Sequence, residues 1–211
     1  MFTGLVTDVG RVTKVEDRNG LRRLTVESAY PIRDLQMGAS VMHAGVCLTL
    51  VEFGERQSAG REIGSWWVVE AIPETLSRTS LGRLDVGSRV NLELSLKLGT
   101  ELGGHLVYGH VDGLGNIGAI ANAGDSRVYR IRIPAHLSKF FAEKGSVTLD
   151  GVSLTVSAVH AKGEEAWFEV SLIPHTLEVT TLGEAVVGQE LNLEVDMLAR
   201  YVARMLELRE P

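Results

Sequence analysis

Four side chains in this sequence have the types needed for covalent and proton-transfer chemistry: Cys47, His105, Ser153 and Asp196. A thiol is a soft nucleophile, and histidine can act as a general base near neutral pH. Each residue type also has a structural role: a strand cysteine can be a small core residue, and an aspartate before a helix can be its N-cap. The residue types alone therefore give candidates but not a reaction.

An internal repeat supplies the context for these candidates. Ser40–Leu50 aligns on Ser146–Val156 with 6 identities in 11 positions, and Ala71–Ser95 aligns on Leu172–Asp196 with 12 in 25. A weaker match relates residues 4–12 to residues 109–117, and the three offsets are 106, 101 and 105 residues. Matching segments in the same order at nearly constant spacing predict a duplicated domain.

Each copy has the pattern of short strands separated by glycine-containing turns. Arg22–Glu27 and Arg127–Ile133 alternate apolar and polar residues, as half-buried strands do. Further strands are predicted at Val41–Val51, Trp66–Ala71, Ser88–Leu94, Ser146–Val159, Ala166–Leu172 and Gln189–Val195. With little helix between them, these strands predict two small closed antiparallel barrels, at residues 1–95 and 96–196.

A helix is predicted at the C-terminal end, within residues 197–211. Its apolar residues recur at helical spacing on one face, namely Leu198, Tyr201, Val202, Met205 and Leu206. An apolar stripe on a helix beyond the second barrel predicts self-association, although packing against its own barrel is an alternative.

Composition excludes several classes of partner. The net charge is −6, and the sequence has no run of Lys and Arg that could follow a phosphate backbone, so nucleic acid is not expected to bind. The single cysteine cannot form an internal disulfide, and no spacing typical of metal ligands occurs, which predicts a cytoplasmic protein without a metal site. No segment has the length of a membrane span.

Five stretches, spread over most of the chain, resemble the riboflavin synthase family. They are Met1–Val6, Gly45–Thr49, Gly103–Gly113, Asp150–Thr155 and Ile173–Leu177. The resemblance implies an all-β fold of two tandem repeated six-stranded antiparallel β-barrels plus a C-terminal α-helix that holds a homotrimer. It also implies that no cofactor is needed and makes lumazine synthase a candidate partner.

The reaction implied by this resemblance uses two identical substrates. Two molecules of 6,7-dimethyl-8-ribityllumazine exchange a four-carbon unit and give riboflavin and 5-amino-6-ribitylamino-pyrimidinedione. Two equal reactants suit two equal pockets, which the family builds from different subunits. Holding the rings together makes the encounter intramolecular, an effect of up to about 7–11 kcal/mol.

Positions at which the repeats differ are the better catalytic candidates, because donor and acceptor need different groups. Cys47 is opposite Ser153, and Ser95 is opposite Asp196. The resemblance gives Cys47 the role of adding to or polarising C7 of the acceptor, and His105 that of moving a proton at the donor methyl group. Further differing pairs are Met42/Thr148, Ala44/Asp150 and Glu74/His175.

The residues expected to bind substrate come from the matching stretches and from repeat-related hydroxyl positions. They are Phe2, Gly4, Leu5, Val6, Ser40, Cys47, Leu48, Thr49, Glu70, Thr75, Gly104, His105, Leu106, Lys144, Ser153, Leu154, Thr155, Ile173, Pro174, His175 and Thr176. The hydroxyl groups suit the ribityl chain and the pyrimidine edge, and the resemblance has Lys144 stabilise negative charge on the deprotonated ring.

The sequence departs from the family pattern at Ala44, where asparagine is usual, at Tyr108 and at Leu94. An alternative function is a non-catalytic lumazine- or flavin-binding protein of the same fold, but the presence of Cys47, Ser153, Asp196 and the hydroxyl residues of both pockets favours the enzyme. A flavin oxidoreductase normally has a nicotinamide-binding domain with a glycine-rich phosphate loop, and the sequence has no such unit. A pure interaction module would leave the paired motifs unexplained.

Overall fold

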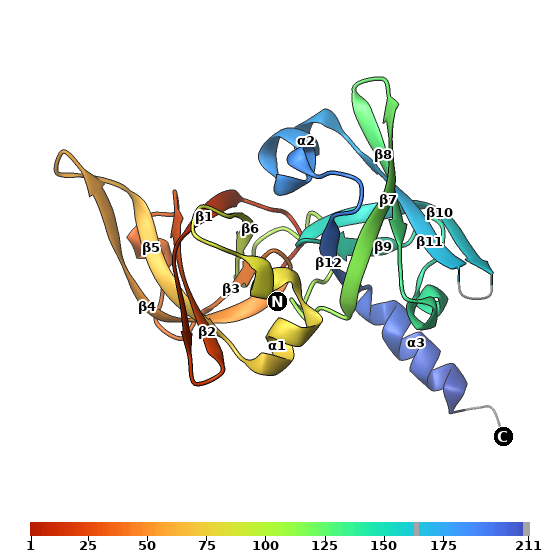
Figure 1. Cartoon of the computed structure of the whole chain (residues 1–211), viewed down its shortest axis with the longest axis horizontal. Coiled ribbons are helices and arrows are strands. Elements are labelled where there is room, and N and C mark those ends of the chain that lie inside the picture. The colour runs from red at the N-terminus through yellow and green to blue at the C-terminus, as the bar shows by residue number, and fades with distance from the viewer. Residues whose placement is uncertain (163–164, 209–211) are drawn as a thin grey trace.

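The computed structural model describes residues 1–162 and 165–208, which form two closed barrels joined side by side (Figure 1). The first barrel contains β1 (Asp8–Arg18), β2 (Leu21–Ser28), β3 (Ser40–His43), β4 (Val46–Ser58), β5 (Arg61–Ala71) and β6 (Arg89–Leu94). The second contains β7 (Gly113–Ala123), β8 (Ser126–Arg132), β9 (Ser146–Leu149), β10 (Val152–Lys162), β11 (Glu165–Leu172) and β12 (Glu190–Val195). Their strand orders are the same, and all pairs are antiparallel, so the predicted fold class is confirmed.

Short helices connect the strands in equivalent places. They are α1 (Pro73–Arg78) and α2 (Pro174–Val179), with the 3₁₀ turns η1 (Ile32–Asp34), η2 (Ser80–Arg83), η3 (Ala135–Phe140) and η4 (Thr181–Glu184). The sequence patterns did not predict α1 and α2, because six residues are too few to show helical periodicity. Each helix has proline at its first position. Proline lacks an N–H group, but an N–H at this position has no partner within the helix, so no hydrogen bond is lost.

Two predicted strands, Val41–Val51 and Ser146–Val159, are wrong, because each is a hairpin of two strands. The turn residues Ala44 and Gly45 have φ values of 46° and 83°, and Asp150 and Gly151 have 43° and 82°. Two consecutive left-handed residues match a tight hairpin turn that joins neighbouring antiparallel strands. Both turns were missed because the alternation of apolar residues continues across them.

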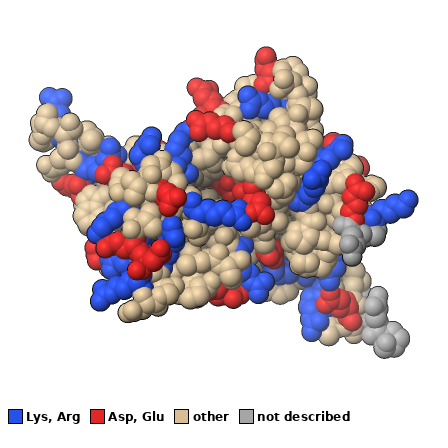
Figure 2. Space-filling view, in the orientation of Figure 1, with Lys and Arg blue, Asp and Glu red and all other residues tan. Residues whose placement is uncertain are grey.

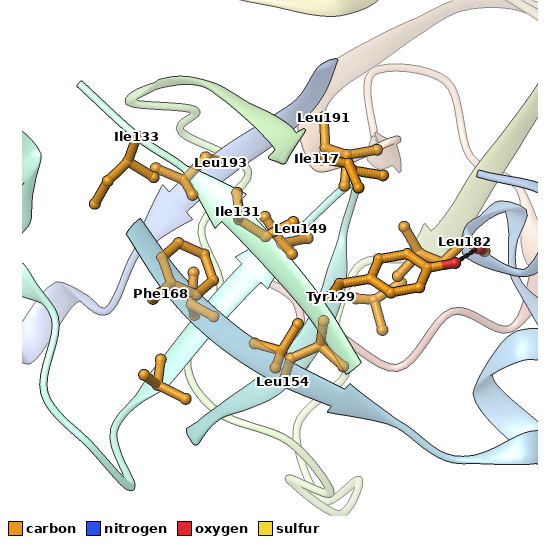
Figure 3. Packing of buried hydrophobic residues seen from close by; sticks show 14 of the residues in the cluster. Ile117, Tyr129, Ile131, Ile133, Leu149, Leu154, Phe168, Leu182, Leu191 and Leu193 are labelled. Carbon is orange, nitrogen blue, oxygen red and sulfur yellow. Dashed lines mark hydrogen bonds between the residues drawn. The ribbon is translucent and has the colours of Figure 1, made fainter. Parts of the chain in front are cut away.

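Each barrel encloses its own hydrophobic core. In the second barrel, Tyr129 is fully buried and its hydroxyl donates to the carbonyl of Leu182 at 2.7 Å (Figure 3). In the first, Trp67 is fully buried and its Nε1–H donates to Nε2 of His43 at 2.8 Å. Burial lowers the pKa of His43 to about 4, so the ring stays neutral and can accept this bond.

The segment that precedes each barrel crosses to the other barrel. In the N-terminal segment (residues 1–7), the carbonyl of Gly4 accepts from the amide of Ser153 at 2.8 Å, and Val6 packs against the second core. In the connecting segment (residues 95–112), the carbonyl of Gly109 accepts from the amide of Cys47 at 2.9 Å, and Val111 packs against the first core. Each barrel is therefore completed by the leading segment of the other repeat.

Two buried asparagines join the barrels reciprocally. Asn91 on β6 donates to the carbonyl of Asp150 at 2.9 Å and accepts from the amide of Thr181 at 2.8 Å. Asn192 on β12 makes the equivalent bonds to the carbonyl of Ala44 and the amide of Ser80, both at 2.7 Å. Separating the barrels would leave these buried groups unpaired, at a cost of about 1–3 kcal/mol each.

The C-terminal helix α3 (Met197–Glu207) projects away from the second barrel (Figure 1). It confirms the predicted helix, and residues 209–211 of the predicted segment 197–211 lie outside the described residues. None of the described helices is long and apolar enough to cross a membrane. Acidic and basic side chains are interspersed on the face that Figure 2 shows, without a continuous basic patch.

The left-handed turn residue Ala44 leads to a stability prediction. Asparagine adopts positive φ more readily than alanine, and its side chain could accept from the amide of Asn91, as Asp150 accepts from Asn192 at 2.7 Å. We expect Ala44→Asn to raise the free energy of unfolding by about 1 kcal/mol, measured by denaturant titration. Ala121→Asn on strand β7 is the control and should give no gain. An unchanged or lower stability of Ala44→Asn would contradict the prediction.

Candidate active site

A pocket of about 400 Å³ opens beside Cys47, at the start of β4. It is bounded by β4, by α1 and by the connecting segment, through Val46, Cys47, Glu74, Thr75, Arg78, Thr79, Gly109, His110, Val111 and Asp112. Cys47 is half-buried and packs against an apolar cluster of Phe2, Met42 and Val107. This Cys47 site therefore places a thiol between an apolar wall and a pocket that His110 helps to line.

The repeat-related position on the second barrel is the Ser153 site. The Nδ1 atom of His105 lies 2.7 Å from the hydroxyl of Ser153, and its Nε2 atom lies 3.2 Å from the hydroxyl of Thr148. Burial lowers the pKa of His105, and the nearby charge of Asp196 opposes this with a smaller effect. The site therefore favours a neutral imidazole between two hydroxyl groups, an arrangement that suits proton transfer.

Asp196 combines two roles at this site. Its Oδ1 atom accepts from the amide of Leu198 at 2.9 Å and so caps α3, as the sequence pattern allowed. The same carboxylate raises the pKa of His105. Capping therefore fixes the carboxylate where it can stabilise a protonated imidazole.

Glycine is required where the crossing segments pass the two sites. A Cβ atom on Gly4 would lie 2.5 Å from the Cβ of Ser153, and one on Gly109 would lie 2.5 Å from the Cβ of Cys47. Both glycines also have positive φ, 76° and 75°. Only glycine lets the backbone approach so closely in this conformation.

The connecting segment supplies a histidine to each site. His105 lies at the Ser153 site and His110 at the Cys47 site. In the repeat alignment, His110 corresponds to Leu5, and His105 has no counterpart because it would precede Met1. The sequence analysis missed His110, although the recurring Gly-His pairs at 104–105 and 109–110 were a signal for it.

The four candidate catalytic residues fall into two groups. His105, Ser153 and Asp196 come together on the second barrel, whereas Cys47 is on the first. Of the predicted binding residues, Thr75 lines the Cys47 pocket, and Gly104 lies against Ser153, because a Cβ on it would lie 3.0 Å from the Cβ of Ser153.

The predicted hydroxyl residues follow the outer faces of the barrels. Thr49 is two residues beyond Cys47 on β4 and pairs with Ser40, which lines a cavity of about 180 Å³. Thr155 holds the same place beyond Ser153 on β10. Lys144 precedes β9 in a turn, with φ of 68°, and its amide donates to the carbonyl of Val156 at 2.8 Å.

Several other predicted binding residues have side chains directed elsewhere. Leu48 and Leu154 are buried in the two barrel cores, so only their backbone is near the outer faces. Glu70 lies 3.4 Å from Arg23 and lines a separate cavity of about 190 Å³. The remaining predicted residues are placed as follows: Phe2 is buried, Val6 is half-buried, Leu5, Leu106 and Ile173 are exposed, and Pro174, His175 and Thr176 form the first turn of α2.

Among the described residues, no three His, Cys, Asp or Glu side chains lie close enough together to form a metal site. The two sites bring together the thiol, the two histidines, the hydroxyls and the carboxylate of Asp196.

The duplicated barrels and their paired sites define a class of tandem-domain proteins, and comparison with known families identifies the domain. The model of the lumazine binding domain matches residues 3–95 and again residues 108–196. Riboflavin synthase of Brucella abortus is 46% identical over 210 residues, which cover 100% of each chain. Those of Mycobacterium tuberculosis and Bacillus subtilis are 45% and 34% identical over 206 residues, 98% of this chain and 98% and 90% of theirs. The chain belongs to the riboflavin synthase family.

Solved structures agree with the fold. LumP complexed with 6,7-dimethyl-8-(1'-D-ribityl) lumazine has a TM-score of 0.72 and 22% identity, covering 92% of this chain and 99% of that one. LumP complexed with riboflavin has a TM-score of 0.72 and 23% identity over the same shares of the two chains. At this identity the likeness supports the double-barrel fold alone.

The electrostatics of the Ser153 site predict the effect of removing one charge. Asp196→Asn keeps a good N-cap but removes the negative charge that stabilises protonated His105. The pKa of His105 should therefore fall further below its usual value, as measured by NMR titration of the histidine rings. Asp125→Asn, at an exposed hairpin turn, is the control and should leave the titration unchanged. A rise in the pKa of His105 in Asp196→Asn would refute this account.

Proposed function

We propose that this protein catalyses the reaction of a riboflavin synthase, the transfer of four carbons between two molecules of 6,7-dimethyl-8-ribityllumazine. The observation that carries the proposal is whole-chain similarity, at 34–46% identity, to proteins that are named riboflavin synthase. The side chains at the two repeat-related sites suit the chemistry. The products are riboflavin and 5-amino-6-ribitylamino-pyrimidinedione.

At the Ser153 site, His105 takes a proton from the 7-methyl group of one lumazine. Burial favours the neutral form of the imidazole, which leaves a lone pair available for the proton. The hydroxyls of Ser153 and Thr148, at 2.7 Å and 3.2 Å, orient the ring, and the charge of Asp196 stabilises the imidazolium that forms. This contribution of general base catalysis is about 10²- to 10⁴-fold.

At the Cys47 site, the thiol adds to or polarises C7 of the second lumazine. The apolar cluster of Phe2, Met42 and Val107 packs against Cys47 on one side, and His110 is among the residues that line the pocket on the other. Thr75 and Thr49 supply hydroxyl groups for the ribityl chain and the pyrimidine edge. The two sites thus share a scaffold but carry different reactive groups, as donor and acceptor require.

Assembly of the chain into a homotrimer through α3 is part of this proposal. One face of α3 is exposed and apolar, formed by Leu198, Tyr201, Val202, Met205 and Leu206, and it continues into a groove of about 340 Å³ beside Phe140 and Phe141. Both sites lie on outer barrel faces, so a second surface is needed to exclude water from them. In the trimer, the Cys47 site of one subunit faces the Ser153 site of the next.

The remaining predictions belong with this proposal. The chain divides into barrel repeats at 1–95 and 96–196 and an oligomerisation helix from 197. No cofactor is needed, and lumazine synthase stays a predicted partner. A cytoplasmic location, which the single cysteine favours, also stays a prediction.

A binding function without catalysis is the second candidate, favoured by the fold shared with ligand-bound LumP. The reactive groups argue against it, since a carrier needs neither the thiol of Cys47 nor the hydrogen-bonded His105–Ser153 pair. Whole-chain identity to the synthases, at 34–46%, is also higher than the identity to LumP, at 22–23%.

A turnover assay separates the two candidates. Purified protein should convert ribityllumazine to riboflavin without added cofactor, followed by riboflavin absorbance. Cys47→Ala and His105→Gln should each lower kcat by at least about 100-fold, while ligand affinity changes little. His136→Gln, at an exposed position on η3, is the control for loss of a histidine. Ligand binding without turnover in the wild-type protein would support the carrier instead.

Disrupting the apolar face of α3 tests the assembly. Met205→Glu places a charge on the exposed apolar face and should dissociate the oligomer, as measured by light scattering after size exclusion. Because each reaction would then lack one of its two facing sites, turnover should fall in parallel. Arg204→Gln, on the polar side of the same helix, should do neither. A fully active monomer would rule out sites shared between subunits.

A further inference from the structure

We propose that Glu93 and Glu194 are positioning residues that act across the two barrels. Each glutamate lies on a strand of one barrel and holds in place a backbone segment that forms the wall of the reaction site on the other barrel. The position of each wall segment is given by the hydrogen bonds described below. The identity of the ligand at each site rests on the function proposed above.

Glu93 lies on β6 of the first barrel and fixes the N-terminal segment. Its Oε1 atom accepts from the amide of Thr3 at 2.6 Å and from the Thr3 hydroxyl at 2.8 Å, and its Oε2 atom accepts from the amide of Gly4 at 2.9 Å. The carbonyl of Thr3 in turn accepts from the backbone amide of His105 at 3.1 Å, and the carbonyl of Gly4 accepts from the backbone amide of Ser153 at 2.8 Å. Glu93 therefore holds the backbone that contacts the Ser153 site of the second barrel.

Glu194 lies at the equivalent place on β12 of the second barrel and fixes the connecting segment. Its Oε1 atom accepts from the amide of Tyr108 at 2.7 Å, and its Oε2 atom accepts from the amide of His110 at 2.9 Å. Between these two residues, the carbonyl of Gly109 accepts from the amide of Cys47 at 2.9 Å. Glu194 therefore holds His110 at the pocket of the first barrel.

A carboxylate is the side chain that fits this task. Both glutamates are about 96% buried, and a buried charge is costly unless it is well paired. Burial raises the pKa of both carboxyl groups, and the bonds from the backbone amides oppose that rise. With both oxygens accepting, an ionised carboxylate satisfies neighbouring amides at once, whereas glutamine would turn one acceptor into a donor.

Strand neighbours would suggest the opposite assignment. On β12, Glu194 is two residues from Asp196, and across the ladder it faces Thr148, which contacts His105. Glu93 faces Met42, which packs beside Cys47. If proximity within a barrel governed function, each glutamate would serve its own barrel. The hydrogen bonds to the crossing segments predict the reverse, so the two accounts can be separated.

The test compares Glu194→Gln with Glu93→Gln at both sites. Cys47 is the only cysteine, so its alkylation by iodoacetamide reports on the first site, and the NMR chemical shifts of the rings of His110 and His105 report on the two sites separately. Glu194→Gln should change the alkylation rate about tenfold and move the ring signals of His110, because one charged hydrogen bond is lost. Glu93→Gln should move the ring signals of His105 and leave the alkylation rate within about twofold.

Glu190→Gln is the matched control, since it is on β12 but pairs with Arg83 outside both sites. It should leave all three readouts unchanged. Denaturant titration checks that each variant is folded. If Glu93→Gln does not fold, Thr3→Val keeps the carboxylate of Glu93 and removes the two bonds of the Thr3 hydroxyl, which donates to Glu93 and accepts from the amide of Leu5. It should produce the same shift of His105 in smaller degree.

Two results would overturn the proposal. In one, each variant alters the site of its own barrel. In the other, both variants alter the two sites equally, as a general loosening of the structure would. These readouts do not depend on turnover, so a protein that makes no riboflavin but shows the crossed pattern would refute the proposed function and leave this inference standing. A protein that makes riboflavin but shows an uncrossed pattern would do the reverse.

Discussion

The exchange of leading segments between the barrels is the constraint on which the rest of the structure depends. Gly4 and Gly109 bring backbone against the strands of the opposite barrel, and buried side chains of both barrels satisfy the polar groups of the interface. Because an unpaired polar group in such an interface is costly, these bonds stabilise each repeat in the presence of the other. Each site is consequently built from both repeats, although its reactive strand belongs to one.

Duplication gave two equal scaffolds, and a few side chains then made them unequal. The connecting segment delivers one imidazole to each barrel, but His105 contacts hydroxyl groups whereas His110 shares a pocket with a thiol. The charges between the barrels have diverged in the same way. Arg83 pairs with Glu190 and Arg89 pairs with Glu184, so each repeat-related position has opposite charges in the two halves. Such pairs favour contact between unlike repeats over contact between like ones.

The fold by itself does not choose between a carrier and an enzyme. The double barrel is shared with LumP at 22% identity, and a shared fold can host different functions. In the function proposed here, the distinction comes from side chains on the outer faces of β4 and β10, where the thiol of Cys47 and the hydroxyl of Ser153 occupy equivalent positions. In the trimer proposed above, this placement would give the apolar side of α3 a part in function, because the subunits would have to meet before either site is closed.

The sequence by itself determined the duplication, the all-β class, the terminal helix and the unequal pair Cys47 and Ser153. These features follow from local periodicity and from identities between the repeats. Both can be recognised without knowing which distant residues are in contact. Only the tertiary structure revealed the crossing of the segments, the place of His110 at the Cys47 site and the hydrogen bonds of the two buried glutamates. These depend on hydrogen bonds between residues 62 to 149 positions apart, and no local pattern encodes which barrel a segment will join.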